Sequence, residues 1–133
     1  MNVHDFAAAK RDGRKLTFTT CYDWWSARIL NESSVDGILV GDSAAMVMHG
    51  HATTLPATPE MMSLHIAAVA RGAPDKFLIG DMPFPWHRKG ISAAMDVVDA
   101  FLTAGAHAVK LEGLEGHEEI VRHIAGSGVP VMG

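Results

Sequence analysis

Short runs of apolar residues alternate along the chain with longer segments in which apolar residues recur every three or four positions. Short apolar runs are typical of strands buried on both faces, whereas the wider spacing is typical of helices packed on one side. The expected strands are 16–19, 37–40, 77–80, 108–111 and 129–132. The expected helices are 24–31, 58–72 with Thr58 as N-cap, about 92–104 and about 115–125. Four strand–helix units and a fifth strand predict an α/β fold with a parallel sheet.

The length of 133 residues is that of one average domain, so we expect residues 1–133 to form a single α/β domain. Two architectures fit five parallel strands: an open doubly wound sheet, or roughly the N-terminal half of a (β/α)8 barrel, which needs about 250 residues. Two long connections, 42–58 and 82–91, follow carboxyl ends of strands. Loops at that edge are where α/β proteins place their active sites.

Composition narrows the range of partners. Eleven Lys and Arg against fifteen Asp and Glu give a net charge of −4, which argues against a nucleic-acid partner. No segment approaches the about 20 apolar residues of a membrane span, and the N-terminus lacks the apolar stretch of a signal peptide, so no membrane partner is expected. The single Cys21 excludes an internal disulfide and favours a reducing compartment. We therefore expect a cytoplasmic protein.

Three acidic residues lie within a residue or two of the ends of expected strands: Asp42, Asp81 and Glu112. Neighbouring parallel strands are about 4.8 Å apart, so carboxylates at consecutive strand ends can converge. Three oxygen ligands with room for water and substrate suit Mg²⁺. The alternative is that each carboxylate only caps the loop or helix that follows it.

Lys110 lies inside an expected strand, two residues before Glu112, so both side chains point to the same face. A charged residue in a buried strand needs a partner. Beside a metal–carboxylate cluster, this ammonium could bind a substrate carboxylate or stabilise an enolate. The alternative is a lone core ion pair with Glu112.

Other motifs give weaker signals. His49 and His51 lack the further ligands of a zinc site, so neither is assigned as a metal ligand. The adjacent Trp24 and Trp25 diverge by about 100° on a helix. We expect one indole to pack inward and the other to meet a partner.

Several segments carry a family resemblance that extends nearly over the whole chain. They read Phe18-Thr19-Thr20-Cys21-Tyr22-Asp23, Ile38-Leu39-Val40-Gly41-Asp42-Ser43, Met46-Val47-Met48-His49-Gly50-His51, Thr54-Leu55-Pro56, Arg71-Gly72-Ala73-Pro74, Asp81-Met82-Pro83-Phe84 and Gly105-Ala106-His107-Ala108-Val109-Lys110-Leu111-Glu112-Gly113. In order and spacing the sequence resembles the ketopantoate (3-methyl-2-oxobutanoate) hydroxymethyltransferases of the phosphoenolpyruvate/pyruvate superfamily.

The resemblance implies a (β/α)8 TIM barrel, of which this chain covers the N-terminal half with five strands and four helices. It implies transfer of a hydroxymethyl group from 5,10-methylenetetrahydrofolate to 3-methyl-2-oxobutanoate, giving 2-dehydropantoate for pantothenate and coenzyme A, through an enolate stabilised by Mg²⁺. By the same resemblance, Asp42, Asp81 and Glu112 serve the metal. Asp42, Ser43, Asp81 and Lys110 contact the oxoacid, and Lys110 stabilises the oxyanion. Members form large homo-oligomers, so a homo-oligomer is expected.

The sequence departs from the family at two places. The loop 84–89 reads Phe-Pro-Trp-His-Arg-Lys, where the family has a short Gly-Ser-Tyr-like stretch. The general-base Glu of the family belongs to the second half of the barrel, which leads to the hypothesis that residues 1–133 alone turn over poorly.

Three alternatives remain open at this point. One is another 2-oxoacid lyase or mutase of the same superfamily. Another is a receiver-like signalling domain with Asp81 as its phosphoacceptor. The last is an inactive partner whose exposed strand edges would promote association.

Overall fold

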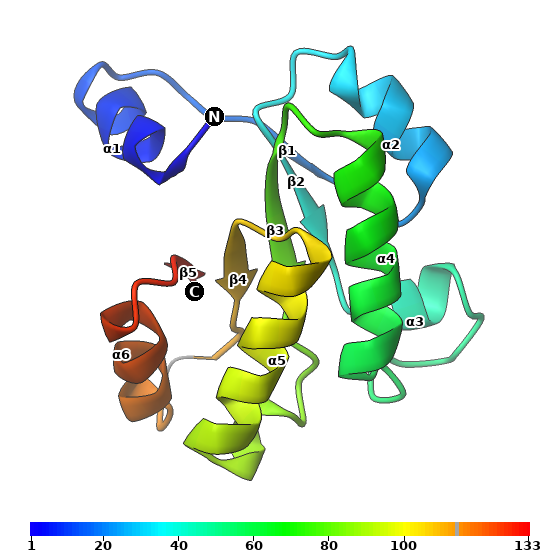
Figure 1. Ribbon diagram of the computed structural model, residues 1–133, viewed down its shortest axis with the longest axis vertical. Coiled ribbons are helices and arrows are strands. Elements are labelled where there is room, and N and C mark those ends of the chain that lie inside the picture. Colours follow the sequence, from blue (N-terminus) through cyan, green and yellow to red (C-terminus); the bar gives the residue numbers. More distant parts are fainter. Residues whose placement is uncertain (114) are drawn as a thin grey trace.

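The computed structural model describes residues 1–113 and 115–133, in which five strands form one parallel sheet (Figure 1). The strands are β1 (Phe18–Thr20), β2 (Gly37–Val40), β3 (Phe77–Asp81), β4 (Ala108–Lys110) and β5 (Val131–Met132). Each strand pairs with the next one along the chain, in the order β1-β2-β3-β4-β5. A doubly wound sheet, including the receiver fold, reverses its strand order at a switch point. The unbroken order therefore rules out that architecture and the receiver interpretation.

The helices between the strands lie side by side on one face of the sheet (Figure 1). They are α2 (Trp24–Asn31), α4 (Pro59–Gly72), α5 (Ile91–Ala104) and α6 (Glu118–Gly126). Contacts run from α2 to α4, from α4 to α5 and from α5 to α6. Helices on one face of a sequentially ordered parallel sheet form part of a barrel wall. This confirms the predicted barrel type, with the four predicted crossover helices in place.

Besides the four predicted helices, the structure contains three that the sequence pattern did not predict: α1 (Val3–Arg11), α3 (Ala44–Val47) and a short 3₁₀ helix, η1 (His87–Lys89). The N-terminus has few apolar residues, so α1 gave no helical pattern of hydrophobicity. The helix begins with a capping box: the Asn2 side chain accepts from the His4 N–H, and Asp5 accepts from the Asn2 N–H. The helices α3 and η1 lie inside the two long connections and are too short to show a helical period.

The face of the sheet that packs against the crossover helices, called here the helix face, carries most of the core. Its fully buried side chains come from the strands and from the facing helices: Ile38, Val40, Leu78, Val109, Leu111, Met62, Ile66, Val69, Val97, Val98, Phe101 and Ile124. The close fit depends on Gly80 in β3. A Cβ there would lie 2.8 Å from both Ile66 Cδ1 and Phe101 Cδ2, so a side chain at this position would push α4 and α5 away.

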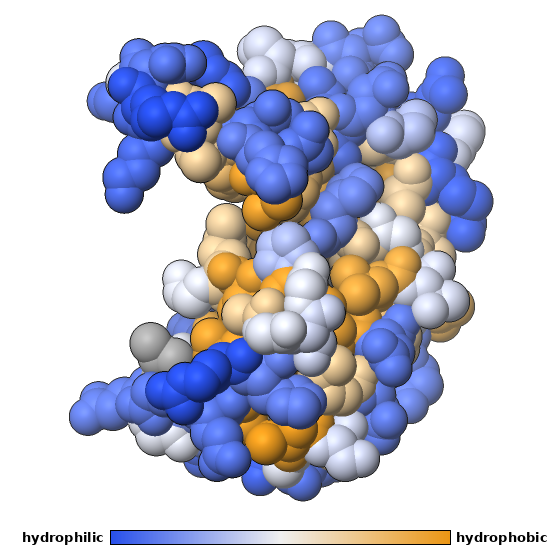
Figure 2. All heavy atoms as spheres, turned by 60° about the vertical axis from the view of Figure 1, so that its left-hand side comes forward, coloured by the Kyte–Doolittle hydropathy of each residue, from blue (hydrophilic) through white to orange (hydrophobic). Residues whose placement is uncertain are grey.

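The opposite face, called here the hollow face, is covered only in part. Phe77, Ile79 and Ala108 are buried on it, whereas Phe18, Leu39 and Met132 stay partly exposed. The helix α1 covers one end through Phe6, whose ring lies 4.9 Å from that of Phe77 and 5.9 Å from that of Phe18. Figure 2 shows hydrophobic residues gathered in a hollow between two hydrophilic ends of the molecule.

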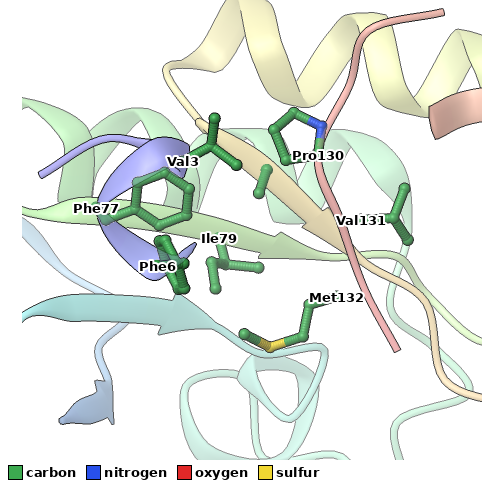
Figure 3. A pocket seen from close by; sticks show the side chains of 8 residues that line it. Val3, Phe6, Phe77, Ile79, Pro130, Val131 and Met132 are labelled. Atoms are coloured by element: carbon green, nitrogen blue, oxygen red, sulfur yellow. The ribbon is translucent and has the colours of Figure 1, made fainter. Parts of the chain in front are cut away.

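Beside α1 the hollow face leaves an apolar cavity of about 320 Å³. Figure 3 shows Val3 and Phe6 of α1 on one side of it, Phe77 and Ile79 of β3 beneath, and Pro130, Val131 and Met132 opposite.

Trp24 and Trp25 are both exposed, at 52% and 64%, so the expectation that one packs inward is wrong. On α2 the small Ala27 faces the core instead, and the Trp24 ring lies under the Arg28 guanidinium.

Within the described residues, no helix has the length and apolar character needed to cross a membrane.

Candidate active site at the carboxyl edge of the sheet

The predicted site residues lie where the strands end. Asp81 and Lys110 are the last residues of β3 and β4 and are partners in the sheet register. Partners on adjacent parallel strands point to the same face, and each lies two residues after a hollow-face residue, Ile79 or Ala108. The site therefore occupies the rim of the hollow face, beyond its apolar part.

An ion pair forms the centre of the site. Lys110 Nζ donates to Asp81 Oδ1 at 2.9 Å and to Glu112 Oε2 at 3.3 Å. The Asp81 side chain is 7% exposed and that of Lys110 21%, whereas Glu112 is 83% exposed. The predicted core pairing of Lys110 thus exists, but its buried partner is Asp81, on the neighbouring strand.

Asp42 approaches the same carboxylate from β2. Its backbone N–H donates to Asp81 Oδ2 at 3.2 Å, so both oxygens of Asp81 accept hydrogen bonds. The Thr54 side chain and the charge of Lys110 act to lower the pKa of the Asp42 carboxyl, whereas the charges of Asp81 and Glu112 act to raise it.

Burial and charge shift the titration of these groups. Burial raises the pKa of Asp81, opposed mainly by the hydrogen bond and charge of Lys110. Burial and then the charge of Asp81 raise the pKa of Asp42. For Lys110, burial acts to lower the pKa, but hydrogen bonds and charges from Asp81 and Glu112 outweigh it and the net pKa is raised. The ammonium is therefore held in its charged form between carboxylates.

The three predicted metal ligands are near one another without forming a closed cluster. In the part of the chain that the structure describes, no three His, Cys, Asp or Glu side chains are grouped closely enough to hold a metal ion. Lys110 Nζ lies between two of these carboxylates, because it bonds to both Asp81 and Glu112. The donor set itself fits a hard cation, because it offers carboxylate oxygens whose mutual repulsion a cation would relieve. The metal assignment stays a prediction.

Ser43, the predicted oxoacid contact, lies beside this group. A Cβ on Gly41 would come within 2.8 Å of Ser43 Oγ and 3.8 Å of Asp81 Oδ2, so only glycine leaves the serine hydroxyl its place. The Ser43 Oγ lies 2.8 Å from the Tyr22 hydroxyl.

The sequence interpretation gave no role to Tyr22 or His65. Tyr22 follows β1 and so belongs to the same sheet edge, which is the signal that could have found it. His65 lies on α4 and contacts the Tyr22 carbonyl oxygen through Nδ1 at 2.6 Å and His49 Nε2 through Nε2 at 2.8 Å. His49, which the sequence did not assign as a metal ligand, is therefore hydrogen-bonded to His65.

Acidic and basic side chains gathered at the carboxyl edge of a barrel-type sheet are typical of α/β-barrel enzymes. The sequence matches the family model for ketopantoate hydroxymethyltransferase over residues 1–133, and the chain belongs to that family.

Curated relatives agree with this assignment. The chain is 54% identical over 134 residues to the 3-methyl-2-oxobutanoate hydroxymethyltransferase of Coxiella burnetii (strain RSA 493 / Nine Mile phase I), covering 100% of this chain and 50% of the relative. It is 54% identical over 131 residues to that of Bdellovibrio bacteriovorus, covering 98% and 50%. For Legionella pneumophila (strain Paris) the identity is 47% over 134 residues, covering 100% and 51%. The chain spans about half the length of the curated relatives it matches.

Solved structures support the fold. Phosphonopyruvate hydrolase, crystallised with oxalate and Mg²⁺, matches with a TM-score of 0.68 and 18% identity, covering 84% of this chain and 38% of that one. The 2,3-dimethylmalate lyase of the PEP mutase/isocitrate lyase superfamily matches with a TM-score of 0.68 and 16% identity, covering 96% and 51%. At these identities the likeness shows the fold alone. The far higher identity to the transferases favours that family over a lyase or mutase.

Proposed function

We propose that this chain supplies the metal- and oxoacid-binding part of a 3-methyl-2-oxobutanoate hydroxymethyltransferase. The reaction moves a hydroxymethyl group from 5,10-methylenetetrahydrofolate to 3-methyl-2-oxobutanoate and gives 2-dehydropantoate. The observation that carries the proposal is the Asp81–Lys110 ion pair, with Asp42 and Ser43 beside it, at the carboxyl edge of a chain that matches the family model throughout.

Asp42 and Asp81, with Glu112 at the exposed side, are the residues that would hold Mg²⁺. When bound, such a cation supplies positive charge that stabilises negative charge on the substrate's oxygens. Phosphonopyruvate hydrolase, which has a similar fold, was crystallised with oxalate and Mg²⁺. Like a 2-oxoacid, oxalate offers neighbouring oxygens to a cation.

Lys110 and Ser43 would orient the oxoacid. The ammonium of Lys110 is charged and partly exposed, so it can attract a carboxylate and stabilise the oxyanion that develops as the carbon next to the ketone loses a proton. The Ser43 hydroxyl and the Asp81 carboxylate both border the space that Gly41 leaves open, so the hydroxyl can donate a hydrogen bond to the same ligand.

Self-association is part of the proposal. Trp24, Trp25 and Ile29 on α2 are all more than half exposed, at 52%, 64% and 58%. Large exposed apolar side chains on one helix are typical of contact surfaces between subunits.

Calorimetric titration of the chain with 3-methyl-2-oxobutanoate, with and without Mg²⁺, tests the proposal. We expect binding that requires Mg²⁺ and is lost in Asp81→Asn. The matched control is Asp99→Asn, the same substitution at an exposed position of α5, which should bind like the wild type. Equal binding by Asp81→Asn, or binding that ignores Mg²⁺, would overturn the proposed site. Product formation on adding 5,10-methylenetetrahydrofolate tests the missing base: slow or absent turnover is expected, and rapid turnover by residues 1–133 would contradict that hypothesis.

A further inference from the structure

Tyr22 is the one aromatic side chain whose polar group reaches the predicted oxoacid contact, within the residues the structure describes. Its ring packs against the core on the helix face, and its phenol oxygen lies 2.8 Å from Ser43 Oγ in a part-buried position. A tyrosine of this kind combines a fixed ring with one hydrogen-bonding group at its tip.

The Ser43 hydroxyl does not cap the helix that follows it. Ser43 stands at the N-cap position of α3 but makes no side-chain capping hydrogen bond. It is confined instead between the Tyr22 phenol and the space that Gly41 leaves open next to Asp81. Its orientation is therefore set by Tyr22.

The backbone of Tyr22 is held from both neighbours in sequence. The Cys21 N–H donates to the Leu39 carbonyl oxygen at 3.2 Å, and the Asp23 side chain accepts from the Ser26 N–H at the start of α2. The Tyr22 carbonyl oxygen is 2.6 Å from His65 Nδ1. A carbonyl can only accept, so Nδ1 carries the hydrogen and donates.

The other ring nitrogen of His65, Nε2, lies 2.8 Å from His49 Nε2, so the two imidazoles share a hydrogen bond. His49 belongs to the connection after α3, and His65 to α4. The two hydrogen bonds of His65 thus connect this connection to the main chain of Tyr22.

We propose that Tyr22 is a positioning residue: its phenol donates to Ser43 Oγ, which leaves the serine hydrogen free to donate to the oxoacid. His65 acts indirectly, because its hydrogen bond fixes the carbonyl group of Tyr22. The substrate part of this inference rests on the proposed function, while the hydrogen bonds do not.

The first test uses the fact that Tyr22 is the only tyrosine in the chain. Tyrosine labelled with ¹³C at Cζ therefore gives a single NMR resonance, whose shift depends on the hydrogen bond of the phenol. Without any ligand, Ser43→Ala should move this resonance. Ser33→Ala, whose hydroxyl bonds the Leu30 carbonyl oxygen, should not. An unmoved resonance in Ser43→Ala would overturn the contact, whatever the function.

The second test measures affinity for 3-methyl-2-oxobutanoate with Mg²⁺. Tyr22→Phe keeps the packed ring and should weaken binding about five- to tenfold, the effect of one hydrogen bond. Added to Ser43→Ala, it should weaken binding no further, because the group it orients is gone. Additive losses would contradict the positioning role. Failure of the wild type to bind the oxoacid would overturn the proposed function and the substrate role together, leaving the NMR result to decide the contact.

The role of His65 is tested with a matched pair of variants. His65→Leu removes the donor to the Tyr22 carbonyl and should weaken oxoacid binding about threefold. His65→Asn places an amide N–H near the same position and should restore most of it. Equal affinities in the two variants would show that His65 acts by packing alone.

Discussion

The two faces of the sheet differ in role: the helix face forms the main core, and the hollow face carries the candidate site at its rim. On the helix face, apolar side chains of β2, β3 and β4 pack with almost no exposed surface against the crossover helices. On the hollow face, apolar residues near α1 give way to Asp81 and Lys110 at the carboxyl edge. Since neighbouring strand residues point to opposite faces, each strand contributes to stability through one set of side chains and to the site through the other. Substitutions on the two faces should therefore differ in kind as well as in size.

The largest expected effect is on the helix face. Phe101→Ala removes a ring with no exposed surface that packs over Gly80, and should lower the free energy of unfolding by about 3–5 kcal/mol. Chemical denaturation measures it. Leu64→Ala on α4, where the side chain is 74% exposed, is the control and should change stability by less than about 0.5 kcal/mol. Similar losses in both variants would contradict this packing.

A smaller loss is expected at the rim of the hollow face. Lys110→Met leaves the buried carboxylate of Asp81 without its cation and should cost about 2 kcal/mol, below the full cost for a buried pair because Lys110 is partly exposed. Adding Asp81→Asn removes the unpaired charge and should recover most of this stability. If the double variant were less stable than Lys110→Met, the ion pair would not be the source of the loss.

Phe6→Ala compares the same substitution on the hollow face with Phe101→Ala on the helix face. Phe6 is only partly buried, and its ring meets that of Phe77 edge-on and that of Phe18 at a tilt, so the expected loss is about 1–2 kcal/mol. Denaturation followed by circular dichroism measures both variants. A loss as large as that of Phe101→Ala would mean that α1 belongs to the main core.

The smallest effect is a pH dependence from His107. Burial, and then the charge of the N-terminus, lower the pKa of His107, whose Nδ1 accepts from the Leu78 N–H at 2.9 Å. The unfolded chain takes up a proton near pH 6.5 while the folded chain does not, so stability should fall as the pH drops below about 6.5. Melting temperatures at pH 7.5 and 5.5 measure this. His107→Gln should reduce the difference and His4→Gln, at an exposed residue, should not; a larger difference in His107→Gln would contradict the assignment.

Much of this architecture follows from local pattern. The apolar runs predict the strands. Asp81 is identified because it follows an expected strand, and Lys110 because a charged residue inside a buried strand needs a partner. The pairing of Lys110 with Asp81 depends on the register of β3 and β4, which spacing alone does not give. The contact of Tyr22 with Ser43 joins two loops from different strands, so only the folded chain reveals it.

The exposed position of Glu112 and of both tryptophans has a similar cause. Glu112 lies beyond the end of β4, where the backbone no longer alternates as in a strand, and α2 turns the small Ala27 toward the core. Whether a side chain at such a position faces the core depends on which helices pack nearby, and the sequence pattern does not encode that choice.

The most direct test of the site is the binding of Mn²⁺, as a spectroscopic substitute for Mg²⁺, followed by the electron paramagnetic resonance signal of the free ion. We expect one Mn²⁺ per chain, bound more tightly when 3-methyl-2-oxobutanoate is present, with binding lost in Asp81→Asn and kept in Asp99→Asn. Undiminished Mn²⁺ binding by Asp81→Asn, or none by the wild type, would contradict a cation site at the carboxyl edge of the sheet.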